Sequence, residues 1–267
     1  MQGEKTEYIS TYTPSLLASL QRNDKREALG IAEGALPFRG VDIWNAYEFA
    51  WLNSHGRPEV SVAQFQVPCS SANMVESKSL KLYLGSYSQT RFGNRNEVIS
   101  TLESDLGVAA RAPVNVSLFA PDNVQHAGLG VLAGTCLDNL DVEIEEYSCN
   151  PDLLELENDV IGRESLYTNL MQSLCPITGQ PDSASVYIQY HGAHISHEGL
   201  LRYLISYRQH AEFSEQIVER IFVDIMNRCE PDRLTVQARF TRRGGIDINP
   251  FRSHDENPTA DVRLWRQ

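Results

Sequence analysis

A cysteine and an aspartate in the segment CPITGQPD could carry out covalent chemistry on an electrophile. Cys175 and Asp182 lie seven residues apart, and two prolines and a glycine between them favour a tight turn outside regular structure. A rigid turn can hold a thiolate that attacks an electrophile beside an acid that moves protons. The alternative is a buried structural cysteine next to a solvated aspartate, and spacing alone does not separate the two interpretations.

The segment VESKSLKLYL places an acid and a lysine at the start of an expected helix. Glu76 and Lys78 lie two residues apart there. A carboxylate can accept two parallel N–H bonds from the edge of a guanine-type base, and each charge-assisted bond contributes about 1.5–3 kcal/mol. An acid in a first helical turn also interacts favourably with the helix dipole, which is the alternative explanation for Glu76.

The segment TRRGGIDINP combines two cations with a double glycine. Arg242 and Arg243 precede Gly244 and Gly245, ahead of a short expected strand. Cations beside exposed backbone amides could receive a phosphate group. A solvated surface turn is the alternative interpretation.

Two other motifs resemble ligand sites but lack the necessary context. Residues 128–133, GLGVLA, fit the dinucleotide pattern G-x-G-x-x-A, yet the following residues do not favour the helix that such a site requires. His191, His194 and His197 are spaced three apart, as a zinc site on a helix could be. Because they follow a strand through a glycine, we expect a surface turn there and predict no metal site, with metal binding as the alternative.

The composition is that of an acidic globular protein. The chain has 267 residues, with 23 Lys and Arg against 35 Asp and Glu, and a formal net charge of -12. This charge disfavours broad contact with nucleic acid. Five cysteines without a CxxC pair argue against a disulfide framework and a thiolate zinc site. The sequence shows neither a leader pattern nor an apolar run of membrane-spanning length, so we expect a cytoplasmic protein without a membrane partner.

An internal repeat predicts two modules. The sequence LYLGSYSQ at residues 82–89 aligns with RYLISYRQ at residues 202–209, 120 residues further along the chain. Each copy lies in a predicted helix that follows an alternating strand and precedes a second helix and a closing strand. The predicted strands are residues 60–67, 114–120, 185–190 and 233–240. This order predicts an α+β fold with antiparallel sheets and paired helices on one face.

The apolar positions of the predicted helices have helical spacing and should face the core. They are Leu80, Leu84 and Tyr87 in the first copy, Leu200, Leu204 and Tyr207 in the second, Ile99, Leu102 and Leu106 in the next helix of the first module, and Val218, Ile221, Phe222 and Ile225 in its counterpart. The acidic residues 150–159 are the expected connection. We therefore predict modules at residues 1–150 and 151–267.

Taken together, four segments resemble the NADPH-dependent 7-cyano-7-deazaguanine reductases, the QueF family, in its longer two-module form. They are CPITGQPD, VESKSLKLYL, TRRGGIDINP and the helix YRQHAEFSEQIVERIF. The resemblance extends over nearly the whole chain. It implies tandem tunnelling-fold modules, a homodimer, and reduction of the nitrile to 7-aminomethyl-7-deazaguanine with two NADPH, a step towards queuosine.

The resemblance also implies a role for each site residue. Cys175 would form a covalent thioimide with the nitrile, and Asp182 would supply a proton. The remaining roles are two sets: Val75, Glu76, Ser77, Ser214 and Glu215 would bind the substrate, and Ser77, Lys78, Arg243 and Gly244 would bind NADPH. Because the nucleophile and the ESK segment lie in different modules, the site is expected where modules meet.

One position departs from the family pattern. The family normally has EFHE where this sequence has EFSE, so Ser214 replaces a histidine. Serine cannot carry the proton that an imidazole carries near neutral pH, and a lost acid–base group typically costs about 10²–10⁴ in rate. His210 would be a substitute one helical turn away if the helix extended that far. Position 217 is Ile, which removes a disulfide partner for Cys175.

Two rival functions remain open on the sequence. A purine-binding protein would keep Glu76 and Glu215 but have impaired turnover because of Ser214. A metal-dependent cyclohydrolase of the same fold would use the three histidines near Cys175.

Overall fold

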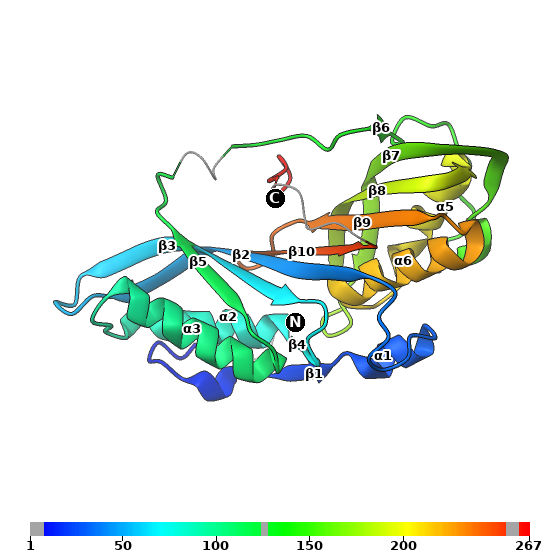
Figure 1. The fold of residues 1–267 in the computed structure, drawn as a ribbon. Helices are drawn as coiled ribbons and strands as arrows, with labels where there is room; N and C mark the ends of the chain where they lie inside the picture. The colour runs from blue at the N-terminus through cyan, green and yellow to red at the C-terminus, as the bar shows by residue number, and fades with distance from the viewer. Residues whose placement is uncertain (1–7, 124–127, 255–261) are drawn as a thin grey trace. The chain divides into compact units, whose positions relative to one another are not determined.

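The structure, a computed structural model, describes residues 8–123, 128–254 and 262–267. Within these ranges the chain forms two compact units. Among the described residues, unit 1 comprises residues 8–24, 44–123 and 243–246, and unit 2 comprises residues 25–43, 128–242, 247–254 and 262–267. Both are mixtures of helices and strands, so the predicted α+β class is confirmed (Figure 1).

Unit 1 contains the first copy of the repeat. Its helices and strands are η1 (Pro14–Leu16), β1 (Ser19–Gln21), β3 (Pro58–Pro68), β4 (Asn73–Val75), α2 (Ser77–Gly85), η2 (Ser86–Gln89), α3 (Arg95–Ala110), β5 (Asn115–Phe119) and most of β2 (Arg39–Leu52). The strands β5, β3 and β2 are neighbours in one sheet, and β1 pairs antiparallel with β4. Figure 1 shows α2 and α3 together on one side of these strands.

Unit 2 contains the second copy of the repeat. Its helices and strands are α1 (Asn23–Ala28, from Lys25 onward), β6 (Thr135–Cys136), η3 (Pro151–Leu153), β7 (Leu156–Leu174), β8 (Pro181–Ile195), α5 (His197–Ser206), η4 (Tyr207–Gln209), α6 (Ser214–Cys229), β9 (Arg233–Phe240) and β10 (Ile246–Ser253, from Asp247 onward). The strand order is β10, β9, β8, β7 and β6, antiparallel except for the parallel pair β6–β7.

The helical spacing read from the sequence does mark the buried faces. Leu200, Leu204 and Tyr207 are at most 1% exposed, and Leu80, Leu84 and Tyr87 are buried in the same way. In α6 the predicted core positions are fully buried, whereas in α3 the buried face runs through Val98 and leaves Ile99 half-buried. Among the described residues, no helix is long and apolar enough to cross a membrane.

The repeat is visible at the level of single hydrogen bonds. The hydroxyls of Tyr83 and Tyr87 lie 2.6 Å apart, and Tyr83 donates to Asp105 of α3 at 2.7 Å. In unit 2 the corresponding hydroxyls, 120 residues further on, lie 2.7 Å apart, and Tyr203 donates to Asp224 of α6 at 2.6 Å. The same triad of two buried tyrosines and a half-buried aspartate thus joins the two helices of each unit.

Candidate functional site

The segment that contains Cys175 forms the loop of the β7–β8 hairpin. The Cys175 N–H donates to the Gln180 carbonyl at 2.8 Å, and the Gly179 N–H donates to the Cys175 carbonyl at 2.9 Å. Gly179 has a φ of +67°, which glycine adopts without the strain that a Cβ would bring. Cys175 is only 5% exposed. The predicted tight turn is confirmed, and it holds the cysteine backbone at two points.

Asp182 lies on β8, next to the residue pair that closes this hairpin. Leu174 pairs with Pro181, and Ser173 pairs with Asp182. The aspartate is half-buried. The fold therefore places Cys175 and Asp182 at the same end of one hairpin, and their roles as nucleophile and acid stay predictions.

Glu76 begins α2 as its N-cap residue. Its carboxylate accepts the backbone N–H of Lys78 through Oε1 and that of Ser79 through Oε2, each at 2.7 Å. Val75, directly before it, is buried in β4, whereas Lys78 is exposed. Each carboxylate oxygen has a second lone pair, so capping leaves Glu76 able to accept further N–H bonds.

The second unit shows what this cap requires. Ser196 caps α5 there, and its hydroxyl accepts the Gly199 N–H at 3.2 Å. The backbone around the two caps corresponds, because the Glu76 N–H donates to Ala18 and the Ser196 N–H donates to Glu155, both at 2.9 Å. A serine thus serves where unit 1 has a carboxylate.

Arg243 and Gly244 form the tight turn between β9 and β10. The Arg243 N–H donates to the Ile246 carbonyl at 3.0 Å, and Gly244 has a φ of +59°. A Cβ at position 244 would lie 3.3 Å from Cδ of Lys81. Together with Ser77 and Lys78, these two residues belong to unit 1, so all four predicted cofactor residues lie in one unit.

A cavity of about 160 Å³ lies beside this turn, lined by Gly244, Gly245, Lys81, Glu48 and Ser88 among others. Lys81 was missed by the sequence analysis. Its spacing of three residues from Lys78 in α2 was the available signal, because such residues are neighbours on a helix surface.

Ser214 and Glu215 are the first two residues of α6. Ser214 is half-buried and Glu215 is 3% exposed. The expectation that His210 lies one helical turn before Ser214 is wrong, because the helix begins at Ser214. His210 instead lies in an extended segment, where its Nε2 is 2.8 Å from Oε2 of Glu212.

The histidine segment is not the expected surface turn. His191 and His194 lie within β8, and His197 begins α5. The strand continues through Gly192. A Cβ at this position would lie 2.9 Å from Cα of Pro231, so the glycine allows the backbone at Pro231 to pack closely against the strand. His191 pairs with Asp232 at 3.2 Å and His197 with Glu164 at 3.3 Å. Among the described residues, no group of His, Cys, Asp and Glu side chains could hold a metal ion.

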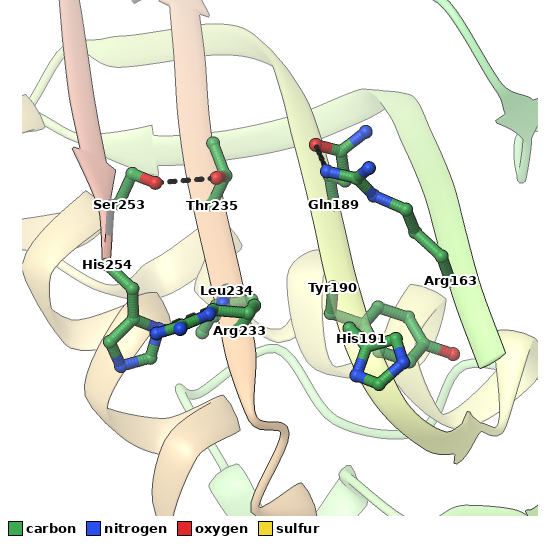
Figure 2. Close-up of a pocket in the computed structure, with 9 residues that line it drawn as sticks. All are labelled: Arg163, Gln189, Tyr190, His191, Arg233, Leu234, Thr235, Ser253 and His254. Carbon is green, nitrogen blue, oxygen red and sulfur yellow. Dashed lines mark hydrogen bonds between the residues drawn. The ribbon is translucent and has the colours of Figure 1, made fainter. Parts of the chain in front are cut away.

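A second cavity, of about 290 Å³, lies over β7, β8 and β9 in unit 2. Figure 2 shows its lining, in which Arg163, His191 and Arg233 occupy one cross-strand row. The hydroxyls of Thr235 on β9 and Ser253 on β10 form a hydrogen bond of 2.8 Å (Figure 2). None of the predicted site residues lines this cavity.

Two family models match this chain, one in its N-terminal part and one in its C-terminal part. Residues 8–118 match a family model described as nitrile reductase, 7-cyano-7-deazaguanine-reductase N-term, and residues 181–259 match one described as QueF-like protein. A solved structure of the archaeosine synthase QueF-Like in the apo form covers 36% of this chain and 95% of its own, at 20% identity and a TM-score of 0.32. A TM-score this low does not add to the fold assignment.

Three curated relatives are similar over nearly their whole length, and each is named NADPH-dependent 7-cyano-7-deazaguanine reductase. The protein from Chromobacterium violaceum is 48% identical over 99% of this chain and 95% of its own. The Bordetella avium protein is 49% identical over 99% of this chain and 97% of its own. The Hydrogenovibrio crunogenus protein is 47% identical over 99% of this chain and 95% of its own. With this identity and coverage, and with both family models matched, the chain belongs to the QueF family of nitrile reductases.

Proposed function

We propose that this protein reduces 7-cyano-7-deazaguanine to 7-aminomethyl-7-deazaguanine with two NADPH, as a step towards queuosine. The observation that carries the proposal is the full-length similarity to relatives named for this reaction, at 47–49% identity. The buried cysteine in a rigid hairpin is consistent with it, because the reaction needs a positioned nucleophile.

Cys175 acts as that nucleophile. Its thiolate adds to the nitrile carbon, so that a C–S bond forms and the C≡N bond becomes C=N. The nitrogen takes a proton from Asp182, which gives a thioimide. Breaking the C–S bond after the first reduction returns the thiolate and leaves an imine for the second.

Glu76 and Glu215 hold the base, together with Val75, Ser77 and Ser214. The two carboxylates would accept N–H groups of the deazaguanine at its two edges. The comparison of caps supports this role for Glu76, since Ser196 caps the equivalent helix without a carboxylate. A charge at position 76 therefore exceeds what the helix needs.

Ser77, Lys78, Arg243 and Gly244 fit the cofactor. Gly244 lines the cavity beside the turn, where a Cβ would approach Cδ of Lys81 to 3.3 Å. Arg243 directly precedes Gly244 and Lys78 lies three residues before Lys81, so both would supply cations from the segments that line this cavity. We add Lys81, which lines the same cavity. NADPH supplies hydride equivalents when bound, and these residues would fix its phosphates.

We further propose tandem tunnelling-fold modules, a homodimer and a cytoplasmic location. Support for the tandem modules comes from the repeated tyrosine triads and the matched helix caps of the two units. The predicted module boundary at residue 150 belongs to the same proposal.

The test is NADPH oxidation by the reduced protein in the presence of 7-cyano-7-deazaguanine, with the amine quantified. Two NADPH consumed per amine are expected, and none with Cys175→Ala. Mass spectrometry should detect the nitrile adduct on the intact protein and not on that variant. If the folded protein binds the base but oxidises no NADPH, it is a purine-binding protein and the proposal fails.

A further inference from the structure

A short segment before α6 holds the backbone of the residue next to Cys175. The Leu174 N–H donates to the His210 carbonyl at 2.9 Å, and the Glu212 N–H donates to the Leu174 carbonyl at 3.2 Å. Residues 210–212 thus add a parallel bridge to the end of β7. The same segment continues into Ser214 and Glu215, so it joins the hairpin of Cys175 to the start of α6.

Glu212 is the last residue of this segment and is 4% exposed. Arg220 of α6 donates to it twice, from Nε at 2.9 Å and from Nη2 at 3.0 Å. His210 lies 2.8 Å from Oε2 of Glu212 and packs edge-on against the ring of Tyr207. Burial alone would raise the pKa of Glu212, but the bonds from His210 and Arg220 outweigh it and lower the pKa to about 2.

The first unit provides an internal comparison. There the Leu52 N–H donates to the Thr90 carbonyl and the Phe92 N–H donates to the Leu52 carbonyl, both at 2.9 Å. The backbone arrangement is the same, with Phe92 in the place of Glu212. Phe92, an uncharged side chain, stacks on Tyr87 with ring centroids 5.2 Å apart and an interplanar angle of 9°. The residue after Leu52 is Asn53, so this hairpin also lacks a nucleophile.

The fold therefore packs an aromatic ring behind this bridge where no thiol follows, and a buried carboxylate with ionic partners where Cys175 follows. Burying a carboxylate is costly and is offset only by good geometry. We propose that Glu212 is a positioning residue for the reaction: with His210 and Arg220 it keeps Cys175 at a fixed spacing from Ser214 and Glu215. The inference rests on the proposed function of Cys175.

The experiment compares Glu212→Gln with Glu219→Gln. Both replace a buried carboxylate of the same region, but Glu219 binds Arg26 and Arg252 instead of the segment beside Cys175. Glu212→Gln should lower kcat about 10- to 100-fold, as misplacement of a catalytic group by about 1 Å does. The KM for NADPH should stay within about twofold, because the proposed cofactor residues lie in unit 1. Glu212→Asp, which keeps the charge, should recover part of kcat.

A second readout needs neither substrate nor cofactor. Iodoacetamide labelling of Cys175, followed by mass spectrometry, should be about tenfold faster in Glu212→Gln than in the unchanged protein, because the loosened bridge exposes the thiol more often. Glu219→Gln should label at the unchanged rate and keep its kcat, although its melting temperature falls. Unchanged kcat and labelling in Glu212→Gln, or equal losses in both variants, would overturn the inference. Absence of the nitrile adduct in the unchanged protein would overturn the proposed function instead, and the labelling comparison would still stand.

Discussion

At the scale of single residues, Ser214 is the position where this chain departs from the family pattern. The structure places it at the first turn of α6, half-buried beside Glu215. Ser214→His should raise kcat by about tenfold or more, because a positioned imidazole contributes about 10²–10⁴ in rate. Steady-state NADPH oxidation measures this. Ser214→Ala is the control, and a loss of activity in Ser214→Ala with no gain in Ser214→His would mean that the serine itself has taken over the task.

A second prediction at this scale concerns Glu212 and the stability of the fold at acidic pH. Its pKa of about 2 in the folded protein is below the value of about 4.3 in an unfolded chain, so its charge stabilises the fold above that value. The contribution, on the order of 2–3 kcal/mol, should disappear as the pH falls from about 5 to 2. Urea unfolding at several pH values should therefore show a shallower acid dependence in Glu212→Gln. An unchanged slope would contradict the prediction.

At the scale of elements, the two helix caps form a matched pair. Replacing either cap residue by alanine should cost about 1 kcal/mol of stability. Only Glu76→Ala should also weaken binding of the deazaguanine, since Ser196 has no proposed contact with the base. Thermal melts and the KM for the nitrile measure both effects. A KM raised equally by Ser196→Ala would remove the distinction between the caps.

Most helices and strands of the repeat could be predicted, because local spacing determines them. Alternation gave β3, β5, β8 and β9, and apolar spacing gave α2, α3, α5 and α6. The strands β2 and β7 were missed, because side-chain burial does not alternate along much of either strand, and β10 was expected only as a short strand. The extent of β8 was underestimated at Gly192, where the close approach of Pro231 is a tertiary contact.

The candidate site shows the same limit. The turn at Cys175 could be predicted from its prolines and glycine. The cluster of Glu212, His210 and Arg220 could not, because it depends on where α6 begins. Likewise, Arg243 and Gly244 follow β9 in the sequence but belong with unit 1 in space.

At the scale of the whole molecule, a buried ionic network links distant parts of unit 2. Glu219 of α6 binds Arg26 at 2.6 Å and Arg252 at 2.8 Å, and Arg252 also binds Asp42 at 2.8 Å. Arg252 is fully buried. Glu219→Ala should cost about 3–5 kcal/mol, because it leaves two buried guanidinium groups without this partner. Chemical denaturation measures this loss, and a cost below about 1 kcal/mol would mean that the network contributes little.

The ionisation of the paired tyrosines, seen as phenolate absorbance, should report on unfolding of the chain at alkaline pH. Burial raises the pKa of Tyr83, Tyr87, Tyr203 and Tyr207 far above the ordinary value of 10.0. An unfolded chain ionises its phenols near that value, so the folded state loses stability as the pH rises past about 10. In an alkaline titration, the phenolate absorbance of these four rings should therefore appear only when the chain unfolds.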